Sequence, residues 1–190
     1  MDQFARIVVG YHGCTEKFAR SLLLGDLPLL EWRPSTNEWD WLGTGIYFWE
    51  HSPERALRWA REKFRKRQDR PTVVGAVVQL GKCFDLLNEA QTSLLEESYQ
   101  NLAQNFSQKG LTLPKNRGTG LKRRELGNLV INNRLDELKV VGVEYDTVRE
   151  AFLEGDPAYP GAGFARESHI QIAVRNPACI LGVFRPFFSS

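Results

Sequence analysis

Three polar side chains alternate with mostly apolar ones along residues 167–174, which read ESHIQIAV. The period of two that is typical of a strand puts Glu167, His169 and Gln171 on one face. A carboxylate, an imidazole and an amide can all bind ligand hydroxyl groups, and the carboxylate can also stabilise positive charge. Burying such groups without partners is costly, so this face needs either bulk water or a polar cleft.

His12 and Tyr47 are further side chains whose surroundings suit contact with a ligand. The run RIVVGYHG predicts a strand over residues 7–12 that ends at the histidine, and Gly13 would let a ligand approach the backbone. Tyr47 lies in GIYFWE, which predicts a strand over residues 45–50. Taken singly, a histidine at a strand end is more often structural, and an aromatic strand more often belongs to a core.

Several other chemistries are disfavoured by the sequence. The three histidines have neither HxxxH nor HExxH spacing, and the cysteines, Cys14, Cys83 and Cys179, form no CxxC pair. We therefore expect no metal site and no disulfide framework. No GxSxG nucleophile motif is present.

Length and composition fit a single soluble domain spanning residues 1–190. Hydrophobic residues make up 42% and charged residues 25% of the chain, and no apolar run is long enough to span a membrane. The sequence starts without a signal-peptide pattern, so we expect a cytoplasmic protein with no membrane partner. The net charge is +2, with basic stretches at residues 61–70 and 121–125. These stretches fit solvated surfaces, or else a basic surface that binds nucleic acid.

Helices and strands alternate irregularly along the chain, which indicates an α+β fold rather than a doubly wound sheet. Thr15 and Gly25 suit the ends of a first helix, and Ser52 suits the N-cap of a second over residues 52–68. Further helices are expected at 89–110 and 125–140, a strand buried on both faces at 73–80, and strands at 140–152, 168–176 and 178–188.

Three segments together resemble the ADP-ribosyltransferase superfamily, on the branch of diphtheria toxin and the poly(ADP-ribose) polymerases. They are YHG at residues 11–13, GTGIYF at 43–48 and QIAVRNPACI at 171–180. The resemblance implies a split β-sandwich of two small, mostly antiparallel sheets with flanking helices. It also implies NAD+ as co-substrate, bound in a cleft between the two sheets, with no metal.

The same resemblance implies roles for individual residues in NAD+ binding. His12 would hydrogen-bond the ribose and amide region, and backbone groups of Gly13 would bind the carboxamide. Tyr47 would stack on one side of the nicotinamide and Trp59 on the other. Gly45 would leave space for the ligand to enter the site. Such a site would hold the leaving group between aromatic faces while positive charge develops on the ribose.

The sequence departs from this family at the catalytic acid, because Gln171 stands where a glutamate is expected. A glutamine can accept a hydrogen bond from a ribose hydroxyl, but it adds no negative charge and cannot act as a base. Glu167 and His169 share its face and could substitute, and Glu154 is a further candidate.

The glycine-rich loop at residues 153–166 precedes this strand. In ADP-ribosylating toxins the loop at this position recognises the acceptor, so the resemblance suggests Tyr159, Phe164 and Arg166 as substrate contacts. An ordinary surface loop with its aromatic rings packed against the sheet is the alternative.

The resemblance predicts an NAD+-dependent mono-ADP-ribosyltransferase that releases nicotinamide. It suggests a toxin-like or phage-defence-like protein, with nucleic acid or protein as the macromolecular acceptor and an antitoxin as a possible partner. The alternative is a catalytically inactive ADP-ribosyltransferase fold that binds NAD+, ADP-ribose or nucleic acid, and Gln171 is the residue that keeps this alternative open.

Overall fold

The computed structural model describes residues 6–66, 68–118 and 122–188, and its α+β fold confirms the expected class. Its strands are β1 (Ile7–Thr15), β2 (Ile46–Glu50), β3 (Pro71–Gln79), β4 (Cys83–Asp85), β5 (Thr147–Phe152), β6 (His169–Val174) and β7 (Ile180–Phe184). Its helices are α1 (Glu16–Leu23), α2 (Pro53–Lys63), α3 (Glu89–Gln108) and α4 (Glu125–Val140), with 3-10 turns η2 (Leu29–Glu31) and η4 (Pro177–Cys179).

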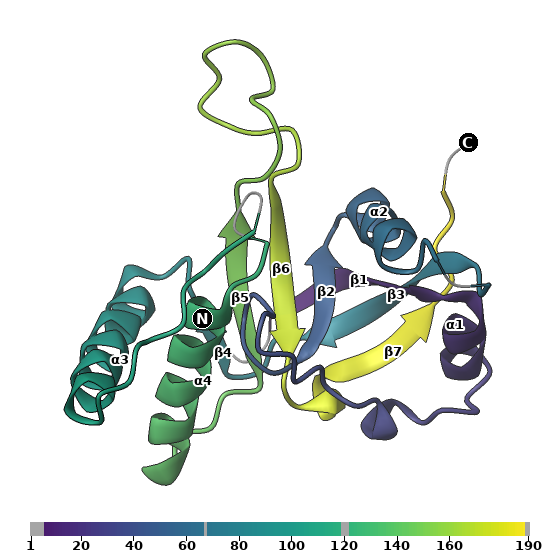
Figure 1. Ribbon diagram of the computed structural model, residues 1–190. Coiled ribbons are helices and arrows are strands. Elements are labelled where there is room, and N and C mark those ends of the chain that lie inside the picture. The colour runs from purple at the N-terminus through teal and green to yellow at the C-terminus, as the bar shows by residue number, and fades with distance from the viewer. Residues whose placement is uncertain (1–5, 67, 119–121, 189–190) are drawn as a thin grey trace.

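The strands of the described residues form one mixed sheet in the order β4-β5-β6-β2-β1-β3-β7 (Figure 1). Among the strand pairs of the described residues, only β4 and β5 run parallel to each other. The expected division into two separate sheets is not found, because β2 pairs with β6 along its whole length. That pairing runs from Ile46 opposite Val174 to Glu50 opposite Ile170, and it joins the two halves into a continuous sheet.

The weakest seam of the sheet lies between β1 and β2. These strands pair at only two positions, where Gly10 faces Glu50 and Tyr11 faces Trp49. β1 nevertheless stays paired with β3 as far as Thr15, so the strand extends beyond the predicted end at residue 12. Beyond Tyr11, β1 and β2 therefore part within the same sheet.

Helices cover both faces of the sheet (Figure 1). α3 and α4 lie beside the half that contains β4, β5 and β6, whereas α1 and α2 lie beside the other half. Ala56 of α2 packs with Trp49 and Val73, and Ala19 of α1 packs with the cluster that contains Phe48 and Val74. Since side chains alternate along a strand, α1 and α2 cover opposite faces.

Most predicted elements are found near their expected places. α4 has the predicted bounds, and Thr15 caps α1 by accepting a hydrogen bond from the backbone N–H of Phe18. α2 ends at Lys63 rather than at residue 68, because Phe64 leaves the helix and turns its buried ring toward Trp59. Ser52 makes no side-chain capping bond there.

Three further expectations concern the burial of β3, membrane-spanning helices and the cysteines. Val73, Val74, Gly75 and Ala76 of β3 are all buried, which confirms a strand covered on both faces. None of the helices in the described residues has the length and apolarity that crossing a bilayer would require. Cys14, Cys83 and Cys179 are free thiols, as expected.

A loop of residues 153–168 joins β5 to β6 and stands out from the rest of the molecule (Figure 1). Its own backbone holds it together, because Ala158 N–H donates to Phe164 O at 3.1 Å and Arg166 N–H donates to Asp156 O at 2.9 Å. The Tyr159 and Phe164 rings meet edge to face at 5.7 Å, and each is 55% exposed. The aromatic rings of this loop are therefore not packed against the sheet.

Gly13 offers a direct test of the packing between β1 and α2. A Cβ atom at this position would lie 2.4 Å from the backbone oxygen of Ala56, whereas one at Gly182 would meet nothing within 4 Å. We expect Gly13→Ala to lower the free energy of unfolding by about 1–3 kcal/mol. The matched strand variant Gly182→Ala should be neutral or slightly stabilising. Urea unfolding measures both; equal effects would show that α2 does not press on β1 as described.

Candidate functional site

A cavity of about 700 Å³ is lined by β1, β2, β6 and α2 and lies where β1 and β2 part. Its volume falls within the roughly 300–1,000 Å³ that is usual for small-molecule sites. All five tryptophans of the chain line it, namely Trp32, Trp39, Trp41, Trp49 and Trp59. So much aromatic surface suits a ligand with flat rings.

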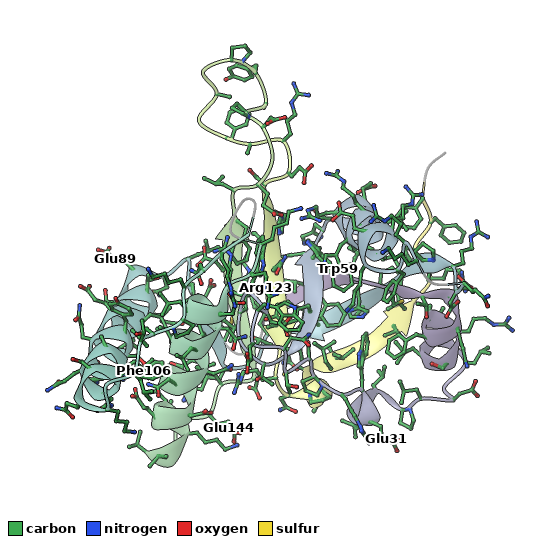
Figure 2. All side chains as sticks on the ribbon, viewed as in Figure 1. Glu31, Trp59, Glu89, Phe106, Arg123 and Glu144 are labelled. Carbon is green, nitrogen blue, oxygen red and sulfur yellow. The ribbon has the colours of Figure 1, made fainter. Side chains whose placement is uncertain are left out.

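Charged side chains of both signs complete the lining. The cations are Arg33, Arg55, Lys63 and Lys122, and the acids are Asp40, Glu62 and Glu154. The Lys63 ammonium lies 4.3 Å from the centre of the Trp59 ring, and the Arg123 guanidinium lies 4.9 Å from that of Trp39. In Figure 2, Trp59 on α2 and Arg123 before α4 come from different halves of the molecule. Aromatic rings beside cations form surfaces that suit nucleotides.

Side chains of α4 hold the loop at residues 33–45, which forms one wall of the cavity. The Asn128 amide donates to the carbonyl oxygens of Asn37 and Asp40 at 3.1 and 3.2 Å. The Asn132 side-chain oxygen accepts from the Thr44 N–H at 3.0 Å. These bonds satisfy backbone groups of an irregular segment and fix its path.

Trp41, an aromatic residue of this wall, is held by contacts with three neighbours. Its indole N–H donates to the Lys122 carbonyl oxygen at 2.9 Å. The Arg124 guanidinium lies 4.2 Å from the ring centre, and the Phe152 ring packs edge-on at 4.7 Å. Burial lowers the pKa of Arg124. The wall is therefore preorganised rather than loose.

His12 bridges the gap between β1 and β2. Its Nδ1 lies 2.8 Å from the Tyr47 carbonyl oxygen, which can only accept, so Nδ1 carries the proton. Burial lowers the pKa of His12 to about 4. The imidazole is therefore neutral near pH 7, and its Nε2 is a hydrogen-bond acceptor at the cavity.

Tyr47 contributes its ring to the cavity while the loop backbone holds its hydroxyl group. The hydroxyl donates to the Gly43 carbonyl oxygen at 2.6 Å and accepts from the Leu42 N–H at 2.9 Å. Burial, with the nearby charge of Asp40, raises the pKa of Tyr47 well above its ordinary value. The phenol stays neutral, so this side chain can serve as an aromatic wall but not as a base.

Gln171 and His169 form a buried pair on β6, each no more than 7% exposed. The solvated sheet face considered from sequence is therefore not what the structure has. His169 Nδ1 donates to the Glu167 carbonyl oxygen at 2.7 Å, so its Nε2 accepts from the Gln171 amide nitrogen at 3.1 Å. Burial lowers the pKa of His169, in keeping with a neutral ring. This bond leaves the Gln171 carbonyl oxygen free to accept at the cavity.

The acids near β6 lie in different environments. Glu154 lines the cavity, and its carboxylate forms an ion pair with Arg55. One of its oxygens also lies 3.7 Å from His169 Nδ1. Glu167 pairs with Arg58 on α2 and lies 3.9 Å from Arg55 Nε, its side chain is 35% exposed, and it is not among the lining residues. Of the two glutamates proposed from sequence as substitutes, only Glu154 is brought to the cavity.

The residues that the family resemblance suggested for NAD+ binding are mostly brought together. His12, Gly45, Tyr47 and Trp59 all line the cavity, together with Gln171. Gly13 is buried beneath α2, where an added Cβ would also lie 3.1 Å from the Trp59 ring. Gly13 is not among the lining residues, so it contributes to packing around the site.

The residues suggested for acceptor contact lie away from the cavity. Tyr159 and Phe164 belong to the protruding loop, and Arg166 donates through Nε to the Pro157 carbonyl oxygen at 3.3 Å. None of these three is among the described residues that line the cavity.

Sequence reasoning missed Trp32, Trp39 and Trp41, which lie in a segment that reads as an ordinary polar loop. One signal was present in the sequence. Three tryptophans within EWRPSTNEWDW are unusual among turn-forming residues, because large apolar rings in a loop need something to pack against. Arg55 was also missed, although it is the ionic partner of Glu154.

Comparison with models of protein families, with curated proteins and with solved structures finds no match to this chain. Among the described residues, no group of histidine, cysteine or acidic side chains is arranged to hold a metal ion.

The pH dependence of stability should report on His12. Its pKa is lowered from 6.5 to about 4 in the folded protein, so between these values the unfolded chain binds a proton that the folded chain does not. Stability should therefore fall as the pH drops through this window, by about 3 kcal/mol for this residue.

Replacing His12 with a residue that does not titrate isolates this contribution. Urea unfolding of the wild type and of His12→Gln over a series of pH values should show the wild type losing more stability as the pH falls below 6.5. Profiles that stay parallel would mean that the imidazole is not buried in its neutral form.

Proposed function

We propose that this protein is an NAD+-dependent mono-ADP-ribosyltransferase. One observation carries the proposal: His12, Tyr47 and Gln171, which come from three distant segments with the family resemblance, line one aromatic cavity. Their neighbours there include Trp59, the residue suggested as the second stacking ring. Spacing along the chain does not bring these three residues together, because they lie on three different strands.

The proposed reaction exchanges one bond for another at the ribose. The bond between the ribose C1′ and the nicotinamide nitrogen breaks, and its electron pair leaves with nicotinamide. An oxygen or nitrogen atom of the acceptor bonds to C1′ and releases its proton. Positive charge develops on the ribose in between, so the site has to hold the leaving group and stabilise that charge.

The lining residues fit the parts of NAD+. Tyr47 and Trp59 supply aromatic surface for the nicotinamide, and the His12 Nε2 can accept a hydrogen bond from a ribose hydroxyl. Arg33 and Lys122 supply positive charge for the pyrophosphate. The Gln171 carbonyl oxygen offers a second acceptor for the ribose.

Nucleic acid is the acceptor that the surface favours. Trp39, which is 44% exposed, lies beneath Arg123 at the cavity, and Lys63 covers Trp59. Aromatic rings paired with cations bind exposed bases and their phosphates. The exposed Tyr159 and Phe164 rings on the protruding loop add a second aromatic surface. Arg67 and Leu121 of the two basic stretches lie outside the described residues.

A catalytically inactive binding module is the second candidate function, and the state of Gln171 favours it. This residue is an amide rather than an acid, and one N–H of its amide donates to His169. A protein of this kind would bind NAD+ or ADP-ribose without breaking the glycosidic bond.

Nicotinamide release from NAD+ separates the two functions. We expect the protein to release nicotinamide and to transfer labelled ADP-ribose to RNA or DNA, with a protein mixture offered in parallel. Modification of protein alone would revise the acceptor. Free ADP-ribose without any acceptor would indicate an NAD+ hydrolase, and binding without release would indicate the inactive module.

Two substitutions test the site itself. His12→Ala and Tyr47→Ala should each abolish nicotinamide release, because one removes the ribose acceptor and the other the stacking ring. His51→Asn and Tyr99→Ala are matched controls, since His51 is an exposed residue at φ 51° and Tyr99 is an exposed residue of α3. Near-normal release by both site variants would contradict the proposed function.

A further inference from the structure

Glu154 is the acid whose place in the cavity best suits the developing ribose cation. It follows the end of β5 at Phe152, and its side chain is only 9% exposed. It lines the same cavity as Gln171. A carboxylate that is removed from water exerts a stronger field than one on the surface, so its charge acts where it is held.

A chain of contacts ties Glu154 to Gln171. The Glu154 Oε2 atom pairs with Arg55 and lies 3.7 Å from His169 Nδ1. The other ring nitrogen of His169 accepts from the Gln171 amide at 3.1 Å. Oε1 of Glu154 has no hydrogen-bond partner among the described residues, and it is not fully buried. One oxygen therefore anchors the side chain, and the other remains for a ligand.

The other acids near the cavity are less suited to this role. Both Asp40 carboxylate oxygens have partners in its own loop, since one accepts from the Ser35 hydroxyl at 2.6 Å and the other from the Asn37 amide at 3.5 Å. Glu62 lines the cavity from the exposed face of α2. Glu167 is turned toward Arg58.

We propose that Glu154 is the catalytic carboxylate of this site and supplies the negative charge that Gln171 lacks. This inference rests on the proposed function. As the bond from C1′ to nicotinamide breaks, the Glu154 carboxylate stabilises the positive ribose while the Gln171 carbonyl oxygen accepts from a ribose hydroxyl. When the acceptor atom bonds to C1′, its proton passes to Glu154 and then to solvent. Arg55 and His169 position the carboxylate.

Nicotinamide release by four proteins tests this assignment: the wild type, Glu154→Gln, Gln171→Glu and the double variant Glu154→Gln/Gln171→Glu. We expect Glu154→Gln to lower kcat by about 100-fold or more, as removal of a group that stabilises transition-state charge does, with little change in KM for NAD+. The double variant should recover part of this loss, because it returns a carboxylate to the adjacent position on β6.

Two measurements separate a loss of charge from a loss of structure. Calorimetric titration with ADP-ribose should give the same affinity for Glu154→Gln as for the wild type. Glu16→Gln, which breaks a Glu–Arg ion pair with Arg185 away from the cavity, should leave turnover unchanged.

The outcomes are distinct. Turnover by Glu154→Gln within about threefold of the wild type, a difference of less than 1 kcal/mol, would overturn the assignment while leaving the proposed function intact. Loss of ADP-ribose binding together with turnover would also overturn it, by showing a structural role. A wild-type protein that releases no nicotinamide would overturn the proposed function and, with it, this inference.

Discussion

The hydrogen bond from the His12 imidazole to the Tyr47 carbonyl oxygen is the interaction on which the site depends. It spans the place where β1 and β2 stop pairing, so a side-chain hydrogen bond links the two strands where backbone hydrogen bonds no longer do. A sheet that continued to pair would bring the two strands together and leave no room between them. Because the bond uses Nδ1, it also fixes which ring nitrogen faces a ligand.

Burial determines what the groups around this gap can do. It keeps His12 and His169 neutral and Tyr47 protonated, so these residues can offer aromatic surface and hydrogen-bond acceptors to a ligand rather than exchange protons with it. Of the acids next to β6, Glu154 is the one that lines the cavity, and Arg55 holds it in place. The cavity thus combines neutral aromatic and imidazole rings with a buried carboxylate that an ion pair holds in place.

Local signals in the sequence predicted most helices and strands. The features that were not predicted depend on contacts between segments that lie far apart in the chain. Thr15 as a cap and the helical period of residues 125–140 depend on neighbours in the chain, and both are found. The single sheet could not be foreseen, because it depends on β2 pairing with β6 far along the chain. The polar face of β6 was expected to be solvated or to line a cleft; it is buried, and the rings that pack beside His169 come from Trp41 and Phe152 in other segments. The convergence of His12, Tyr47 and Gln171 was expected only through the family resemblance.

The most direct test is a crystal structure of the protein with a carbocyclic analogue of NAD+, in which a methylene group replaces the ribose ring oxygen and prevents cleavage. We expect the nicotinamide ring between Tyr47 and Trp59, a ribose hydroxyl within hydrogen-bonding distance of His12 Nε2, and Glu154 beside C1′. An analogue bound elsewhere on the protein, with these side chains untouched, would contradict the account.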